Sequence, residues 1–133
     1  MEHPLKTLWE KPSRLVIGFM SGTSADGVDA ALVRITGFGT QTRAEQLGFR
    51  FVPFSDEVRA EILRLAGGDP ASAADFCRMN FLLGELFCEA GEALCAQTGT
   101  KLSDIDLIGS HGQTFWHIPE KEEYLSRTFA STF

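Results

Sequence analysis

Two apolar runs near the start of the chain are separated by a short polar turn. Both runs are rich in β-branched and aromatic residues. The turn ends in Asp26-Gly27, a pair that favours chain reversal because both residues tolerate positive φ. The pattern predicts a β-hairpin with strands at about 14–20 and 27–36.

A third apolar pattern follows, in which Leu47, Phe49 and Phe51 recur at every second position. This alternation is typical of a strand, and the short turn before it predicts a meander with the first hairpin. A fourth strand, expected to be buried, lies at residues 106–110, with His111 just past its carboxyl end.

Between the third and fourth strands the apolar positions take a helical period. Ser55 is the expected N-cap of a helix that ends at Gly67, with acidic residues in the first turn, where the helix dipole favours them. A longer helix is expected from about Ser72 to Gln97, with Asp75 as the capping-box partner of Ser72. The order β-β-β-α-α-β predicts an α/β fold with a mixed sheet.

Residues 1–13 are expected to form a poorly ordered lead. Pro4 and Pro12 are its expected breakers, and Trp9 is its candidate anchor to the core. The chain of 133 residues is long enough for one domain with a core of its own. That domain is expected to occupy residues 14–133.

Composition excludes several classes of partner. The chain has 12 basic and 18 acidic residues, a net charge of −6, whereas nucleic-acid binding needs clustered Lys and Arg. No apolar stretch approaches the roughly 20 residues of a membrane span, and no signal peptide is evident. The three cysteines form no closely spaced pair, which fits a reducing compartment. We therefore expect a cytoplasmic protein that binds neither nucleic acid nor membrane.

The first turn carries more polar chemistry than a chain reversal needs. Ser21, Thr23 and Ser24 add hydroxyls, and small residues such as Gly22 let backbone N–H groups approach an anion closely. These features are typical of a phosphate-binding turn. The alternative is a simple hairpin whose hydroxyls bond to the local backbone, since short glycine-rich turns are weakly diagnostic.

Asp26 and Asp29 are the carboxylates nearest to this turn. A carboxylate beside a triphosphate commonly holds Mg²⁺, directly or through water. We expect Asp26 to be a turn former and Asp29 to be the magnesium ligand. The alternative for Asp29 is a solvent-facing strand residue.

A second polar cluster follows the expected fourth strand, where Gly112, Gln113 and Thr114 come after His111. Ligands of open α/β sheets collect beyond the carboxyl ends of strands. Imidazole, amide and hydroxyl groups together can bond several hydroxyls of a polar ligand. We expect a site here, whereas His117 is expected to pack or to cap a loop.

Two blocks of sequence resemble one known family. Residues 20–32, Met-Ser-Gly-Thr-Ser-Ala-Asp-Gly-Val-Asp-Ala-Ala-Leu, resemble the N-terminal signature of the anhydro-N-acetylmuramic acid kinases. Residues 109–119, Gly-Ser-His-Gly-Gln-Thr-Phe-Trp-His-Ile-Pro, resemble the family's other N-terminal motif. The blocks occur in the family's order and at about its spacing. The resemblance runs from about Arg14 to Pro119 and covers about the first third of a family member.

The resemblance implies half of an actin-like or hexokinase-like (ribonuclease H-like) ATPase fold, with residues 14–133 as part of the N-terminal domain of a two-domain sugar kinase. It implies ATP and Mg²⁺ as cofactors and an anhydro amino sugar as substrate. The implied reaction opens the anhydro bridge and yields N-acetylmuramic acid 6-phosphate, in peptidoglycan recycling. The sugar-binding residues would be His111, Gln113 and Thr114. The ATP-phosphate segment would be Gly22, Thr23, Ser24, Ala25, Asp26, Gly27, Val28 and Asp29.

The family's general base lies in a later Asp-Thr-Gly-Pro-Gly-Asn motif, so no catalytic residue is expected before Phe133. The tail alternates like the start of another strand, and we expect a fragment with little or no kinase activity that forms homo-oligomers through exposed surface. The alternative function is a non-catalytic sugar- or partner-binding remnant. The His-Gly-Gln-Thr block argues against another kinase or ATPase of the same superfamily.

Overall fold

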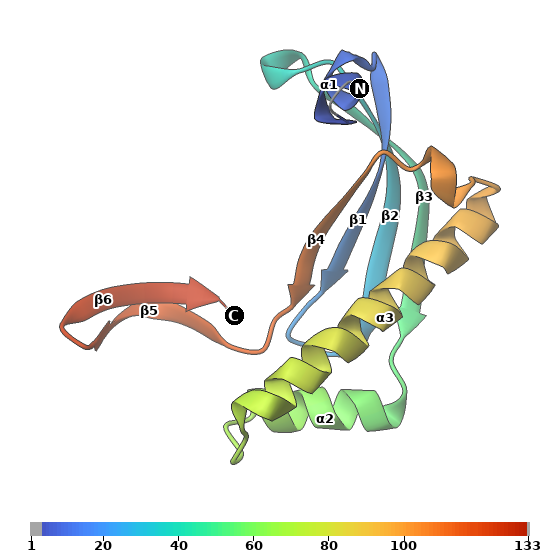
Figure 1. Cartoon of the computed structure of the whole chain (residues 1–133). Helices are drawn as coiled ribbons and strands as arrows, with labels where there is room; N and C mark the ends of the chain where they lie inside the picture. The colour runs from blue at the N-terminus through green and yellow to red at the C-terminus, as the bar shows by residue number, and fades with distance from the viewer. Residues whose placement is uncertain (1–3, 133) are drawn as a thin grey trace.

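The computed structural model describes residues 4–132 and arranges its strands in two sheets (Figure 1). The larger sheet has four strands in the order β3-β2-β1-β4, which confirms the predicted α/β fold with a mixed sheet. The helices α2 and α3 connect β3 to β4, and α3 runs across one face of the sheet. These elements are β1 (Ser13–Ser21), β2 (Gly27–Thr36), β3 (Arg43–Pro53), α2 (Asp56–Ala66), α3 (Ala73–Thr98) and β4 (Leu107–Gln113).

The directions of the strands decide where the two polar segments lie. β1, β2 and β3 form the predicted antiparallel meander, with Met20 opposite Asp29 near the first turn. β4 pairs with β1 in parallel. Because parallel strands end at the same edge of a sheet, the turn after β1 and the segment after β4 lie next to each other.

Alternate side chains of β1 and β2 form the core against α3. Ile17 and Phe19 are 2% and 7% exposed, and the Phe19 ring lies 5.7 Å from the ring of Phe87 on α3. Gly91 allows this close approach, because a Cβ at that position would lie 3.0 Å from the Phe19 ring. The packing fixes α3 beneath the ends of β1 and β4.

Both predicted helix starts are confirmed. The Ser55 hydroxyl caps α2 by accepting the Val58 N–H at 3.3 Å. Ser72 and Asp75 form the capping box of α3, in which hydrogen bonds from the Ser72 backbone and hydroxyl hold the pKa of Asp75 below its usual value. α3 ends at Gly99, whose φ of 68° is the left-handed conformation that favours glycine.

The N-terminal lead contains a helix, α1 (Pro4–Glu10), that the sequence pattern did not predict. Reading Pro4 as a breaker was wrong, because a proline is tolerated in the first turn of a helix, where its missing N–H is no loss. Pro12 agrees with the prediction, since α1 ends at Glu10 before it. Trp9 was expected to anchor the segment to the core. It instead stacks on Phe38 outside the core, with ring centroids 5.1 Å apart, and the two side chains are 71% and 46% exposed. Residues 1–3 lie outside the described part of the chain.

Asp106 ties this lead and β1 to the start of β4. Its carboxylate accepts the Leu15 N–H at 2.9 Å and pairs with the Lys11 ammonium, while its own N–H donates to the Leu15 carbonyl at 2.8 Å. Burial alone would raise the pKa of Asp106. The hydrogen bonds from Lys11 and Leu15 outweigh burial and hold the pKa below its usual value.

Replacing Asp106 with asparagine should lower the free energy of unfolding by about 1–2 kcal/mol at neutral pH, because the charge-assisted pairing is lost. A depressed carboxyl pKa stabilises the fold above the unfolded-state value of about 3.9 and stops doing so as pH falls through the folded value. Urea titrations of the native chain and of Asp106→Asn at about pH 7 and pH 3 should therefore show that the difference between their free energies of unfolding is smaller in acid. An equal difference at both pH values would contradict this role.

The face of the sheet opposite α3 is left open by the described helices. Gly48 faces α3, since a Cβ there would lie 2.4 Å from Thr98. The neighbouring Phe49 and Phe51 therefore point to the opposite face, where they are 47% and 44% exposed. Leu47 does not share that face, because it lies at a β-bulge and packs against the core.

β4 is an edge strand, and the prediction of a buried strand there was wrong. Among the described strands it pairs with β1 alone, so Leu107 and Ile108 are 42% and 66% exposed. β4 also extends to Gln113, beyond the predicted end, because its pairing with β1 continues past an irregularity to Ser21. His111 accordingly lies within the strand.

A separate hairpin extends away from the main sheet (Figure 1). It consists of β5 (His117–Tyr124) and β6 (Arg127–Thr132), which are antiparallel. Short 3-10 helices span Gly39–Gln41 and Leu102–Asp104. A search of the described helices finds none long and apolar enough to span a membrane.

Candidate functional site

The turn after β1 and the end of β4 are joined by direct hydrogen bonds. The Gln113 side-chain Nε2 donates to the Gly22 carbonyl at 2.8 Å and to the Thr114 carbonyl at 2.9 Å. The Thr114 N–H donates to the Ser21 carbonyl at 3.2 Å. The two segments that carry the polar motifs therefore form one continuous edge of the sheet.

Ser21 and Gln113 are buried connectors within this edge, 1% and 9% exposed. The Ser21 hydroxyl lies 2.6 Å from both the Gly27 carbonyl and Gln113 Oε1, and it donates its one proton to either acceptor. Ser21 was expected to add a hydroxyl to a phosphate-binding turn, but here it faces inward. Gln113 was expected to bind a sugar, and its amide hydrogens are instead engaged by protein carbonyls.

The turn itself presents Thr23 and Ser24 to solvent. The Ala25 N–H closes the turn on the Gly22 carbonyl at 3.1 Å. In the part of the chain that the structure describes, the N–H groups of Thr23 and Ser24 have no hydrogen-bond partner. Adjacent free N–H groups beside a glycine are the usual elements of an anion site, so the turn fits a phosphate.

The sequence pattern suggested that Asp26-Gly27 reverses the chain through a positive φ, but neither residue has one. The residue with positive φ is Ala25, at 49°, and its side chain is buried. Gly27 is required for another reason: a Cβ there would lie 2.3 Å from the Val52 carbonyl and 2.7 Å from the Phe51 ring. Next to the turn, β3 therefore lies so close to Gly27 of β2 that no side chain fits between them.

The two carboxylates near the turn have different surroundings. Asp26 accepts the Ser24 hydroxyl at 2.8 Å, which leaves its other oxygen free. Asp29 is exposed on the open face of the sheet, in register with Met20 and Phe51. Mg²⁺ at a nucleotide site takes one or two carboxylates together with phosphate oxygens and waters, so Asp26 and Asp29 are the candidate ligands near the turn.

Cysteines do not add a metal site. Cys77 and Cys88 are exposed and Cys95 is buried, and its burial raises the pKa of the Cys95 thiol. Within the described residues, no group of three or more His, Cys, Asp or Glu side chains is placed to hold a metal ion.

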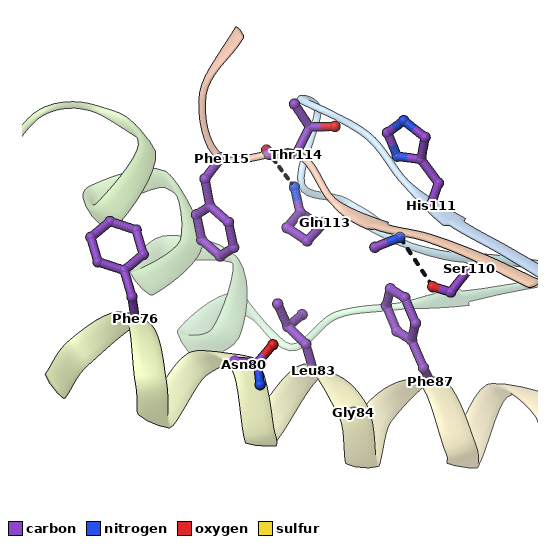
Figure 2. A pocket seen from close by; sticks show the side chains of 11 residues that line it. Phe76, Asn80, Leu83, Gly84, Phe87, Ser110, His111, Gln113, Thr114 and Phe115 are labelled. Carbon is purple, nitrogen blue, oxygen red and sulfur yellow. Dashed lines mark hydrogen bonds between the residues drawn. The ribbon is translucent and has the colours of Figure 1, made fainter. Parts of the chain in front are cut away.

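A cavity of about 510 Å³ lies between α3 and the end of β4 (Figure 2). The side chains of Leu83 and Phe87 project into it from α3, and Phe115 faces them from the segment after β4. Asn80 is an exposed lining residue on the same helix. Its volume is within the range of small-molecule sites. The lining residues are Phe76, Asn80, Leu83, Gly84, Phe87, Ser110, His111, Gly112, Gln113, Thr114 and Phe115.

The three predicted sugar-binding residues do not point the same way. Figure 2 shows the side chains of His111 and Thr114 pointing away from α3, whereas the Gln113 amide nitrogen donates to the Thr114 carbonyl. His111 is exposed and Thr114 is 8% exposed. The polar groups of these three side chains therefore do not converge on the cavity: Gln113 is bonded within the sheet edge, and the imidazole lies on the other side of the strand.

Sequence reasoning missed the contribution of α3. Phe76, Leu83 and Phe87 follow the spacing of an apolar helix face, and Asn80 occupies the position between them. Asparagine is disfavoured inside helices, so its presence on an apolar stripe was a usable signal.

The family model for anhydro-N-acetylmuramic acid kinase matches residues 14–130. The chain belongs to the anhydro-N-acetylmuramic acid kinase family. Both segments of the hydrogen-bonded edge lie inside the matched region. The recognition made from the two sequence blocks is thereby confirmed.

Several curated relatives carry the same family name. An anhydro-N-acetylmuramic acid kinase of Caldanaerobacter subterraneus subsp. tengcongensis is 48% identical over 128 residues, which is 96% of this chain and 32% of the relative. Those of Bacillus thuringiensis subsp. konkukian and Bacillus anthracis are each 40% identical over 107 residues, 80% of this chain and 28% of the relatives. The chain thus spans about a third of the length of these kinases.

Proposed function

We propose that this chain supplies the phosphate-binding turn and one wall of the sugar site in an ATP-dependent kinase of anhydro-N-acetylmuramic acid. The observation that carries the proposal is the hydrogen-bonded edge, in which Gln113 joins the β4 end to Gly22. A phosphoryl donor on the turn and an acceptor beside β4 would be neighbours there, and phosphoryl transfer depends mainly on such positioning.

In this proposal residues 14–133 are part of the N-terminal domain of a two-domain kinase with an actin-like ATPase fold, acting in the cytoplasm in peptidoglycan recycling. ATP would supply the phosphoryl group, and Mg²⁺ held by Asp29 or Asp26 would offset its charge. The free N–H groups of Thr23 and Ser24 would bind phosphate oxygens. The reaction would open the anhydro bridge and leave N-acetylmuramic acid 6-phosphate, with the general base supplied from outside these residues.

A chimera tests the proposal. Residues 1–133 of this chain would replace the matching third of the Caldanaerobacter kinase, and phosphate transfer from Mg-ATP to the anhydro sugar would be followed in a single turnover. We expect transfer by the chimera and little or none by the 133-residue chain alone. A folded but inactive chimera, or clear transfer by the chain alone, would refute this account.

A second candidate function is a sugar-binding module without transfer chemistry. It is favoured by the cavity beside α3, because the described residues that line it include no aspartate, glutamate, lysine or arginine. Sugar binding by the chain together with an inactive chimera would favour this alternative.

We also propose that the chain self-associates through the open face of its sheet. Met20, Phe49 and Phe51 on this face are 50%, 47% and 44% exposed, and exposed apolar patches commonly mark contact surfaces. Phe49→Lys should raise the dissociation constant of a dimer about tenfold, measured by light scattering. Leu102→Lys, outside this face, is the matched control. A chain that remains monomeric at high concentration would contradict the proposal.

A further inference from the structure

Arg59 on α2 reaches across to the turn between β1 and β2. Its terminal nitrogen Nη2 donates to the Ser24 carbonyl at 3.5 Å. Ser24 is also one of the two residues in this turn whose N–H groups have no hydrogen-bond partner in the described chain. The guanidinium therefore lies beside the segment that fits a phosphate.

The direction of this side chain differs from that of its neighbour on the same helix. Arg64 pairs with the carboxylate three residues before it, Glu61, at 2.8 Å. Arg59 has Asp56 at the corresponding position, yet no ion pair joins the two in the part of the chain that the structure describes. Arg59 is turned toward Ser24 instead, so its charge is placed at the turn and is not neutralised along α2.

The start of α2 is fixed to the turn (Figure 1). The Phe54 N–H, two residues before α2, donates to the Asp26 carbonyl at 3.0 Å. Further along the helix, Ile62 and Leu65 are buried in the core, 0% and 4% exposed. Because the backbone on both sides of the contact is held, only the side chain of Arg59 has to move to reach a ligand on the turn.

The contact with Ser24 can be exchanged for a stronger one. A hydrogen bond of 3.5 Å is at the long limit for such bonds. Hydrogen bonds from a guanidinium to a phosphate are shorter and charge-assisted, and the planar group can make two in parallel. The carboxylates of Asp26 and Asp29 make the surroundings of the turn negative, so a polyphosphate there needs a cationic partner.

We propose that Arg59 binds the phosphate chain of the nucleotide. Its guanidinium leaves the Ser24 carbonyl and donates to phosphate oxygens, while the N–H groups of Thr23 and Ser24 bind the same chain from the turn. Arg59 lies outside both blocks of sequence that predicted the site. This inference rests on the proposed function, because it assumes that the turn holds the phosphates.

The test uses inorganic tripolyphosphate with Mg²⁺, which has the phosphate chain of ATP without the nucleoside. It would be titrated into the ¹⁵N-labelled chain, and dissociation constants taken from the amide shifts of Thr23 and Ser24. Arg59→Gln should raise the dissociation constant about tenfold, since a charge-assisted hydrogen bond contributes at least that much. Glutamine still has a donor for the Ser24 carbonyl, so the substitution removes the charge and not that contact. Arg59→Lys keeps the charge and should restore part of the affinity.

Arg64→Gln is the matched control, because it removes the same charge from the same helix at a guanidinium already held by Glu61. It should leave the dissociation constant unchanged. Equal losses in Arg59→Gln and Arg64→Gln, or a lysine variant no better than the glutamine variant, would overturn the inference.

The native chain separates the two possible failures. If tripolyphosphate moves the amides of Thr23 and Ser24 and Arg59→Gln binds it equally well, the inference about Arg59 fails and the proposed function stands. If these amides do not move in the native chain, both fail.

Discussion

Replacing Gly27 with alanine is expected to destabilise the fold by about 3 kcal/mol, at the upper end of overpacking costs. The added Cβ would lie 2.3 Å from the Val52 carbonyl and 2.7 Å from the Phe51 ring. The carbonyl belongs to the backbone of β3 and cannot rotate away, so β2 and β3 must separate behind the turn. Urea unfolding followed by circular dichroism measures the loss.

Gly22→Ala is the matched control for that substitution. A Cβ at Gly22 has no neighbour within 4 Å, so the free energy of unfolding should change by less than about 0.5 kcal/mol. The methyl group would nevertheless stand beside the free N–H groups of the turn and should weaken phosphate binding. A stable Gly27→Ala protein would contradict the packing account. Unchanged nucleotide binding by Gly22→Ala would contradict the phosphate role of the turn.

Gln113→Glu should produce the second large effect, a loss of about 3–5 kcal/mol at neutral pH. The substitution keeps the shape of the side chain but places a carboxylate oxygen against the carbonyls of Gly22 and Thr114, which now receive the amide hydrogens. Buried oxygen atoms would then face one another without a proton between them, and the sheet edge would open.

The pH dependence of this variant identifies the cause. A protonated carboxyl group can still donate one hydrogen bond, so the folded state should raise the pKa of the introduced glutamate above the unfolded value of about 4.3. The loss in free energy of unfolding, relative to the native chain, is then smallest in acid and grows as pH rises through that value. Urea unfolding of both chains at about pH 4 and pH 7.5 measures this change in the loss. Gln46→Glu, on the exposed surface of β3, should show no such trend.

Much of the fold was predictable because local signals agree with it. The period-two and helical patterns placed the strands β1, β2 and β3 and the helices α2 and α3, and the caps at Ser55 and Ser72 marked the helix starts correctly. The parallel pairing of β1 with β4 is a long-range choice, but a helical connection between the strands favours it. That pairing is what brings the two motifs together.

The errors arose where tertiary packing overrides local preference. Nothing local shows that Gly27 is required by the Phe51 ring rather than by its own φ, or that the strain of the turn falls on Ala25. Local sequence also does not show which polar side chains bond to other protein groups. Gln113 and Ser21 look like binding groups in the sequence, and their partners on the adjacent strand become visible only once β4 lies beside β1.

The central claim is that one edge of the sheet holds a phosphate on the β1–β2 turn and a sugar at the end of β4. Amide shifts of the labelled chain, titrated separately with Mg-ATP and with anhydro-N-acetylmuramic acid, test it most directly. We expect the nucleotide to move the amides of Thr23 and Ser24 and the sugar to move those of residues 110–115. Shifts confined to residues remote from this edge, or no shift with either ligand, would contradict it.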